Sequence, residues 1–274
     1  MITSNKRLEE ILIEEYGNIE KYLREININE KARLRIIEGI KLPEELILSL
    51  SMGIPIILGA IYNYTIYTLT ISAIYAIEVG FQIWTIKRAI AYYSPLTGSI
   101  YFKKKSLEEI INGLSNALHS NNIKIEKGTA LALKFTGDRI VYYPIHIDEK
   151  IDNIEEIISK AVIDAIGAHE GSHLYFNSEI KASYLGFLIY SKMNNLDKYE
   201  NTKKVIRKNI EECIEYVKNN KEYNPYSMGE CGANFDLHIN DFSIDIKKKV
   251  ERLRHMKDKD IIKEIKNYAL NYSN

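Results

Sequence analysis

The residue pattern with the clearest chemical meaning in this sequence is His169-Glu170-Gly171-Ser172-His173. On an α-helix, residues i and i+4 lie on one face, one turn apart, so the imidazoles of His169 and His173 can converge on one zinc ion. Glu170 follows the first histidine, where its carboxylate could take a proton from a zinc-bound water and pass it to a leaving amine. We therefore predict His169 and His173 as zinc ligands and Glu170 as the catalytic base. Two ordinary histidines beside a surface glutamate are the alternative interpretation.

A zinc site of this kind requires a third protein ligand, and Glu230 is our first choice. Pro225 marks a turn after which a helix should begin. The small residues Gly232 and Ala233 would let this helix pack closely against the helix of the two histidines. Asn234 lies one turn after Glu230 and could orient a ligating imidazole through a hydrogen bond. For Glu230 the alternative is a carboxylate that the helix dipole favours near a helix start.

Three other side chains compete with Glu230 for this position: Glu179, Asp236 and His238. Glu179 is close to the histidines in sequence, but on a continuous helix it would point away from both of them. His238 is also a candidate catalytic residue, because an imidazole can donate a hydrogen bond to the oxyanion of a tetrahedral intermediate. A structural role is the alternative for this lone histidine.

Regular secondary structure must hold these residues in place. Turn signals at Gly128 and Gly137 separate short apolar runs that are typical of strands. We expect these strands over residues 123–125, 130–135 and 139–147. A helix with a broad apolar face should begin near residue 154 and run into the two histidines. Further helices are expected over residues 106–119, 180–220 and 243–272.

The N-terminal part contains two segments of different character. Residues 1–45 are expected to form amphipathic helices, the second of which carries Leu34, Ile36 and Ile37. Residues 46–94 are expected to form an apolar helical hairpin, and no charged residue occurs between Leu46 and Ile77. Residues 46–86 are long enough for two passes of about 20 residues through a bilayer, which predicts membrane association. A buried helical pair in a soluble protein is the alternative.

Charge and cysteine content narrow the partners and the compartment. The 37 basic residues balance the 37 acidic ones, so no electrostatic term favours nucleic acid as a partner. Cys213 and Cys231 lie far apart and form no CxxC pair, so we expect no disulfide and a reducing compartment. The protein is therefore expected to be cytoplasmic, or membrane-associated with a cytoplasmic catalytic domain. The bias toward Ile, Lys, Asn and Tyr is typical of an AT-rich genome, such as that of an archaeon or one of its viruses.

The motifs and their order resemble the HtpX and CAAX-prenyl-protease family of gluzincin peptidases. That family has a membrane hairpin, a helix, strands, an HExxH helix and a downstream E-x-x-A-D helix, which stands here as Glu230-Cys231-Gly232-Ala233-Asn234. The resemblance implies that the two histidines and Glu230 bind zinc and that Glu170 is the base. It also implies an edge strand within residues 139–147 that pairs with an extended peptide substrate.

The chain departs from this family in three respects. Asn234 replaces the usual Asp, Phe235 stands where an Arg commonly follows, and no second membrane hairpin separates the two motifs. The first two changes alter the surroundings of the expected ligands. The third changes the expected topology.

These features predict an α+β, mainly α protein. Its expected parts are the amphipathic N-terminus, the apolar hairpin and a zincin-like metallopeptidase domain with a small sheet over residues 95–274. The predicted function is a zinc-dependent endopeptidase that hydrolyses polypeptides with a zinc-bound water activated by Glu170. The alternative is a non-catalytic structural or interaction protein, for example a viral or membrane component, in which the motif is vestigial or accidental.

Overall fold

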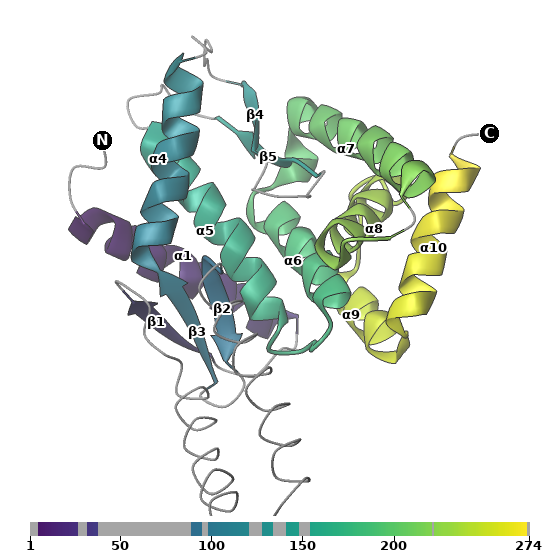
Figure 1. Cartoon of the computed structure of the whole chain (residues 1–274), viewed down its shortest axis with the longest axis horizontal. Coiled ribbons are helices and arrows are strands. Elements are labelled where there is room, and N and C mark those ends of the chain that lie inside the picture. Colours follow the sequence, from purple (N-terminus) through teal and green to yellow (C-terminus); the bar gives the residue numbers. More distant parts are fainter. Residues whose placement is uncertain are drawn as a thin grey trace, which may run out of the picture. The chain divides into compact units, whose positions relative to one another are not determined.

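A computed structural model describes residues 5–26, 32–37, 89–94, 98–120, 128–133, 141–147, 154–220 and 222–272 (Figure 1). The described residues are mainly helical and include small sheets of two and three strands, which confirms the α+β, mainly α class. The chain forms two compact units, one of residues Met1–Lys31 with Glu109–Asn274 and the other of Ala32–Glu108. The boundaries expected from the sequence, at residues 45 and 94, stay a prediction. Residues before 32 join the larger unit because the first helix packs against the helix of the two histidines.

The smaller unit contains a three-stranded sheet. Its strands are β1 (Arg33–Ile37), β2 (Ala91–Ser94) and β3 (Ser99–Lys103). The central strand β3 runs parallel to β1 and antiparallel to β2, and Ile100 and Phe102 on it are fully buried. The helix α4 (Lys104–Ser120) follows β3 directly, in agreement with the helix predicted over 106–119. The helix predicted around Leu34 and Ile36 is wrong, because five residues are too few to separate helical from strand spacing by pattern alone.

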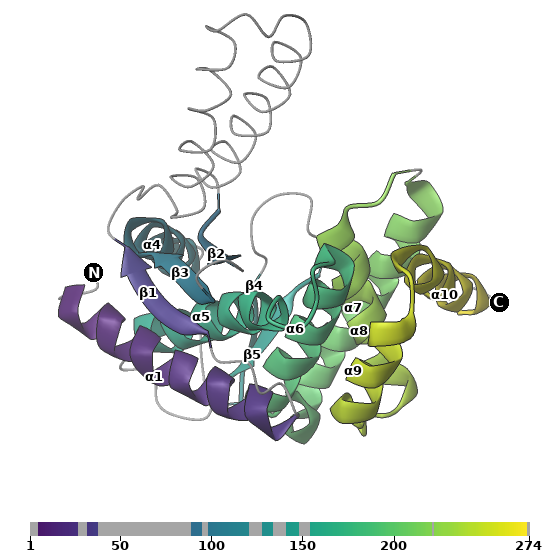
Figure 2. The same ribbon diagram turned by 90° about the horizontal axis from the view of Figure 1, so that it is seen from below.

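The larger unit contains the remaining elements (Figure 2). They are α1 (Asn5–Glu25), β4 (Ala130–Leu133), β5 (Tyr143–His146), α5 (Ile154–Ser172), α6 (Glu179–Met193), the 3-10 turn η1 (Leu196–Lys198), α7 (Glu200–Asn219), α8 (Pro225–Ile239), α9 (Ile246–His255) and α10 (Asp258–Asn271). Helix α5 lies between α1 and α6, and α6 in turn packs against α8. Helices α7 and α10 also contact α8. This order explains why α5 is apolar on several sides: Ile158, Val162 and Ala168 on it are fully buried.

The β4–β5 pair agrees with the sequence prediction, whereas the C-terminal helices do not. The strands predicted over 130–135 and 139–147 correspond to β4 and β5, which pair antiparallel with Leu131 opposite Ile145. The single helix predicted over 243–272 is wrong, because Met256 and Lys257 adopt extended backbone and separate α9 from α10. Acidic Asp258 and Asp260 lie in the first turn of α10, where the helix dipole favours them.

Some predictions fall on segments that lie outside the described residues. They are most of the apolar hairpin expected over 46–94 and the strand over 123–125, whereas the last residues of that expected hairpin, Ala91–Ser94, form strand β2 and not a helix. Among the helices that are described, none is both long enough and apolar enough to cross a bilayer.

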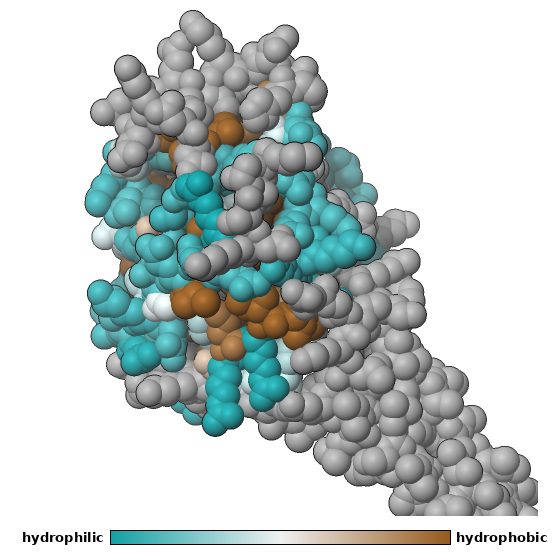
Figure 3. Space-filling model, turned by 90° about the vertical axis from the view of Figure 1, so that its left-hand side faces the viewer, coloured by the Kyte–Doolittle hydropathy of each residue, from teal (hydrophilic) through white to brown (hydrophobic). Residues whose placement is uncertain are grey.

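The described surface is mostly polar on the side drawn in Figure 3. Hydrophilic residues cover most of it, and hydrophobic residues gather in a band across its middle. Among the described residues, the large hydrophobic side chains that are exposed are Ile13, Ile239, Leu270 and Tyr272. The other large apolar side chains mostly contribute to the core, as expected for a folded domain.

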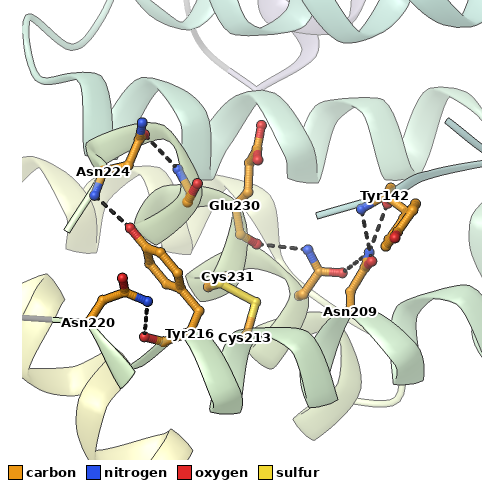
Figure 4. Close-up of a disulfide and its surroundings, with 10 residues drawn as sticks. Tyr142, Asn209, Cys213, Tyr216, Asn220, Asn224, Glu230 and Cys231 are labelled. Atoms are coloured by element: carbon orange, nitrogen blue, oxygen red, sulfur yellow. Dashed lines mark hydrogen bonds between the residues drawn. A yellow bond between two sulfur atoms is a disulfide. The ribbon is translucent and has the colours of Figure 1, made fainter. Parts of the chain in front are cut away.

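A disulfide joins Cys213 on α7 to Cys231 on α8 (Figure 4). The two Cα atoms lie 5.7 Å apart, and both side chains are fully buried. The expectation of no disulfide is therefore wrong. The two cysteines meet because α7 and α8 pack side by side, which the sequence spacing of 18 residues does not reveal.

Removal of this disulfide should destabilise the larger unit. A cross-link over 18 residues restricts the unfolded chain, and the loss of such a link costs about 3 kcal/mol. We expect the free energy of unfolding of the Cys213→Ala/Cys231→Ala variant to be lower than that of the wild type by this amount. The variant should therefore unfold at a lower denaturant concentration. Reductant should lower the midpoint of the wild type and leave that of the variant unchanged. Equal midpoints of the wild type with and without reductant would show that the disulfide does not form.

A group of ionisable side chains, two of them buried, lies between α1 and α5. Glu15 and Asp164 are both almost fully buried, and Lys160 forms an ion pair with Glu15 (Nζ–Oε1 3.2 Å). Asn194 donates a hydrogen bond to Asp164 (Nδ2–Oδ2 3.1 Å). Burial, and then the negative charge of Glu15, raise the pKa of Asp164 to about 8. Asp164 is therefore mostly protonated at neutral pH.

Asp164 should make the free energy of unfolding fall as the pH rises. Below about pH 4 this carboxyl is protonated in both states, whereas between about pH 4 and pH 8 only the folded state keeps the proton. The folded state thus binds more protons in this window, and stability is lost up to the folded pKa. Asp164→Asn lacks the titrating carboxyl and should not lose this stability. We therefore expect its free energy of unfolding, taken relative to that of the wild type, to rise by at least about 1 kcal/mol between pH 5 and pH 8. Urea unfolding at several pH values measures this, with the exposed Asp197→Asn as control, and equal pH profiles of wild type and Asp164→Asn would contradict it.

Candidate metal centre

The two motif histidines come together at the C-terminal end of α5. Helix α5 ends at Ser172, and a tight turn follows in which the amide of His173 donates to the carbonyl of Glu170 (3.2 Å). The Nε2 atoms of His169 and His173 lie 3.3 Å apart, and the two rings are nearly perpendicular. The predicted convergence of the two imidazoles is therefore present.

The third group in this cluster is Glu179. Its Oε2 lies 3.4 Å from Nε2 of His169 and 3.4 Å from Nε2 of His173. The expectation that Glu179 points away from the histidines assumed a continuous helix and is wrong. The chain turns after α5, and Glu179 is the first residue of α6, where Ser178 is the N-cap. This reversal directs Glu179 back toward the end of α5.

The spacing of these three atoms fits a tetrahedral metal ion. Three ligands at about 2.0–2.1 Å from a zinc ion form one face of a tetrahedron whose edges are about 3.3–3.4 Å. The triangle formed by the two Nε2 atoms and Oε2 has edges of 3.3, 3.4 and 3.4 Å. Two imidazoles and one carboxylate are also a donor set that zinc accepts. The residues present therefore fit a metal ion, and the fourth vertex of the tetrahedron is left for a water molecule or a substrate.

Both imidazoles are held by their other ring nitrogen. Nδ1 of His173 lies 3.0 Å from the carbonyl oxygen of Phe176, which can only accept, so this nitrogen carries a proton and, in the neutral ring, Nε2 carries the lone pair. Nδ1 of His169 lies 3.3 Å from the hydroxyl of the buried Ser183 on α6. Ligating histidines typically make such hydrogen bonds, because these bonds fix the tautomer and the ring orientation.

The electrostatics of the cluster favour bound positive charge. Burial lowers the pKa of His173, but the hydrogen bond to Glu179 and the charges of Glu170 and Glu179 outweigh burial and raise it above its ordinary value. Burial raises the pKa of Glu179, but the two histidines reverse this effect and hold it well below its usual range. The side chains of His169 and His173 are largely buried, whereas that of Glu179 is 41% exposed. The exposed part of the Glu179 side chain lies away from Oε2, because that oxygen is itself buried.

A glycine permits the close contact between α5 and α6 at this cluster. A Cβ atom on Gly186 would lie 2.8 Å from the Cα of His169 and 3.0 Å from its amide nitrogen. Because any side chain at this position would collide with backbone, α6 can approach His169 closely only with glycine here. This approach brings Ser183 to the His169 ring.

Glu230 occupies a different place from the three clustered groups. It lies on α8, is almost fully buried, and accepts a hydrogen bond from the hydroxyl of Tyr143 (2.8 Å). Its carboxylate is not among the ligand atoms that lie within 4.8 Å of one another in the cluster. Tyr226, one turn earlier on α8, packs against the His169 ring with centroids 5.4 Å apart. The structure thus brings the first half of α8 to the cluster, with Glu179 rather than Glu230 nearest to the histidines.

The small residues of α8 face α6 and not the helix of the histidines. A Cβ atom on Gly229 would lie 2.3 Å from the carbonyl oxygen of Ile180, and one on Gly232 would lie 2.2 Å from the ring of Tyr184. The expectation that Gly232 packs against the histidine helix is therefore corrected. Helix α6 lies between α5 and α8, so the small residues of α8 contact α6.

Asn234 does not orient an imidazole as expected. Its amide donates to the carbonyl of Glu230 (2.8 Å), and its Oδ1 accepts from Asn209 on α7 (3.0 Å). Asn209 also bonds both backbone groups of Tyr142, at 2.9 and 2.8 Å (Figure 4). Asn234 therefore ties α8 to α7 and to the start of β5.

The same contacts bear on the strand expected to bind a peptide. The hydroxyl of Tyr190 donates to the carbonyl of Pro144 (3.0 Å), and Asn209 bonds the backbone of Tyr142. The backbone groups of Ile147 bond to Gly128 and Thr129, next to β4. Because the bonding direction alternates along a strand, the backbone groups of Tyr142 and Pro144 lie on the edge of β5 that faces away from β4. Side chains thus already bond to the backbone of Tyr142 and Pro144 at this edge. The implied pairing of the strand with a peptide substrate is therefore wrong at these two residues.

Asp236 takes part in a buried ion pair away from the histidines. The ammonium group of Lys249 on α9 contacts Asp236, and the hydroxyl of Tyr184 donates to the same carboxylate oxygen (2.7 Å). Both charged side chains are at least nine-tenths buried. Asp236 is therefore committed to joining α8, α6 and α9 and does not compete for the metal.

His238 also lies away from the cluster. Its Nε2 is hydrogen-bonded to the hydroxyl of Tyr272, and burial followed by the charge of Arg207 lowers its pKa. Tyr226, which contacts His169, is twelve residues earlier on the same helix, or about 18 Å along the helix axis. The structure does not bring His238 to the histidine pair as an oxyanion donor.

Sequence reasoning missed Ser183 and the carbonyl of Phe176, and it placed Glu179 behind Glu230 as a rival ligand. A signal for Glu179 was present in the sequence. Ser178 is a preferred N-cap residue, and an acidic residue directly after it is typical of the first turn of a new helix. No local signal identifies Ser183 as a neighbour of His169, because this contact depends on how α6 packs on α5.

Comparison of the whole chain with protein-family models, with curated proteins and with solved structures found no match. The chemistry of the site is therefore inferred from its own residues. The cluster offers two oriented imidazoles and a carboxylate, and the half-buried Glu170 follows the first imidazole. This arrangement can bind a divalent metal and place a base beside it.

Proposed function

We propose that this protein is a zinc-dependent peptidase with a zincin-like site. The ligands are Nε2 of His169, Nε2 of His173 and Oε2 of Glu179. The observation that supports this proposal most strongly is the triangle of 3.3–3.4 Å formed by these three atoms. The HExxH pattern contributes the second support, because it places Glu170 directly after the first ligand.

A bound zinc ion supplies Lewis acidity toward a water molecule and toward the carbonyl group of a peptide bond. Glu170 accepts the proton of the attacking water and donates it to the leaving amine. It is rotated about 100° around the helix from His169, so its carboxylate flanks the side on which substrate approaches. Its charge already acts on this side, since it contributes to the raised pKa of His173.

The phenol of Tyr226 is the candidate donor for the oxyanion, in place of His238. Tyr226 is half-buried in the first turn of α8, and its ring packs against the ring of His169. Asn224 fixes this turn by accepting from the amides of Tyr226 (2.9 Å) and Ser227 (3.3 Å). A donor held on a rigid helix start can stabilise developing negative charge without reorganisation.

The substrate class proposed is an unfolded or flexible polypeptide. The side chain of Glu179 is 41% exposed, so the cluster lies near the surface of the larger unit, and its buried Oε2 must become accessible for a peptide bond to bind. The alternative is a non-catalytic protein in which the same residues hold a structural metal. One observation favours this alternative, because side chains occupy the strand edge of β5 where a peptide would otherwise pair.

Metal analysis together with a peptidase assay tests the proposal. We expect the purified full chain to bind one zinc ion and to cleave casein or a peptide library. A chelator should abolish cleavage, and added zinc should restore it. A chain that does not bind zinc refutes the proposed site. A chain that binds zinc but cleaves no peptide supports the non-catalytic alternative.

A further inference from the structure

The turn that carries the third ligand is held by the C-terminal helices. This turn, residues 173–179, joins α5 to α6. The guanidinium of Arg254 on α9 lies over the ring of Tyr175 at 5.7 Å, and Glu251 accepts a hydrogen bond from the Tyr175 hydroxyl (3.3 Å). These contacts attach the first part of the turn to α9.

A second attachment lies directly beside Glu179. The hydroxyl of Ser178 donates a hydrogen bond to Oδ1 of Asp258 (2.8 Å), which is the first residue of α10. The same hydroxyl oxygen accepts from the amide of Lys181 and thereby caps α6. Because the hydroxyl hydrogen of Ser178 points to Asp258, a lone pair of the hydroxyl oxygen is directed at the amide of Lys181. The acid of α10 thus sets the orientation of the cap that begins α6.

We propose that Ser178 and Asp258 are positioning residues for the metal ligand Glu179. Through this pair, the α9–α10 hairpin is an integral part of the metal centre. Glu179 is the first residue after the cap, so its backbone is fixed by the same hydrogen bonds that fix Ser178. The inference rests on the proposed metal site and adds a group of residues, about 80 positions later in the chain, that decide how well it is formed.

The coupling between zinc binding and the docking of α10 acts in both directions. If docking of α10 favours the ligand geometry of Glu179, bound zinc must favour docking of α10 by the same factor. Zinc should therefore slow amide hydrogen exchange in the first turn of α10. This readout does not depend on catalysis.

The closing experiment compares zinc affinities of full-length variants in a chelator competition. The variants are Ser178→Ala, Asp258→Ala and the double variant. Asp260→Ala is the matched control, since it removes the same charge from the same exposed helix turn. We expect Ser178→Ala and Asp258→Ala each to weaken zinc binding about three- to tenfold, as expected for the loss of one hydrogen bond. The double variant should be no weaker than the worse single variant.

The outcomes separate this inference from the proposed function. Asp258→Ala and Asp260→Ala with equal zinc affinities, or additive effects in the double variant, overturn the positioning role while the metal site stands. Zinc that slows exchange in α10 of the wild type, but not of Ser178→Ala, supports the coupling. A wild-type chain that binds no zinc overturns both the metal site and the positioning role.

Discussion

Glu170→Gln is expected to reduce peptide hydrolysis by about 100- to 10,000-fold, the range for loss of a general base. Gln has the size of Glu and keeps hydrogen-bonding capacity, but it cannot accept the proton of the attacking water. Glu170 is not one of the three clustered ligand atoms, so the variant should still bind zinc stoichiometrically. The measurements are kcat/KM on a peptide substrate and the zinc content of the same preparation.

The matched control is Glu211→Gln, which makes the same change at an exposed position of α7. It should retain wild-type activity and zinc content. Full activity of Glu170→Gln would refute the role of Glu170 as base. Loss of zinc together with activity would instead indicate that Glu170 itself contributes to binding the metal.

The second large effect is expected for the third ligand. Glu179→Gln should weaken zinc binding by at least about 100-fold, because loss of a ligand exceeds the 10- to 100-fold cost of losing a residue that only orients one. Glu230→Gln should weaken binding by at most about tenfold. The amide oxygen of Gln can still accept from Tyr143, and the carboxylate of Glu230 lies outside the cluster. Zinc affinity of both variants is measured by chelator competition.

This pair of variants decides between two assignments. The geometry favours Glu179, whereas the resemblance to the HtpX and CAAX-prenyl-protease family favours Glu230. If Glu230→Gln loses zinc and Glu179→Gln keeps it, Glu230 is the third ligand and α8 must move toward the histidines. If both lose zinc to the same extent, neither assignment is sufficient by itself.

Much of the metal centre follows from local sequence. The spacing of His169 and His173 requires convergence on any α-helix, since residues i and i+4 share a face. The apolar pattern over residues 154–168 indicated that helix correctly. The strands near 130–133 and 143–146 were equally visible, because alternation and turn residues are local signals.

Errors arose where a short pattern fits two structures or where a chain reversal is needed. The apolar residues within 33–37 fit both a helix and a strand, because the segment is short. Pairing with β3 makes it a strand. At Met256 and Lys257, the chain breaks what the pattern presents as one helix, so α10 can pack on α8. Cys213 and Cys231 meet only because two helices lie side by side.

The sequence by itself determined the pair of histidines, the glutamate proposed as base and the helix that carries them, since all of these depend on residues within one helical turn. The tertiary structure alone decided which carboxylate joins the histidines as candidate ligand, the hydrogen bond of Ser183 to His169 and the anchoring of Ser178 by Asp258. These contacts depend on how α5, α6 and α10 approach one another, and close-packed glycines such as Gly186 set that approach. Long-range packing is not encoded in the spacing of neighbouring residues, so no local pattern could have specified these contacts.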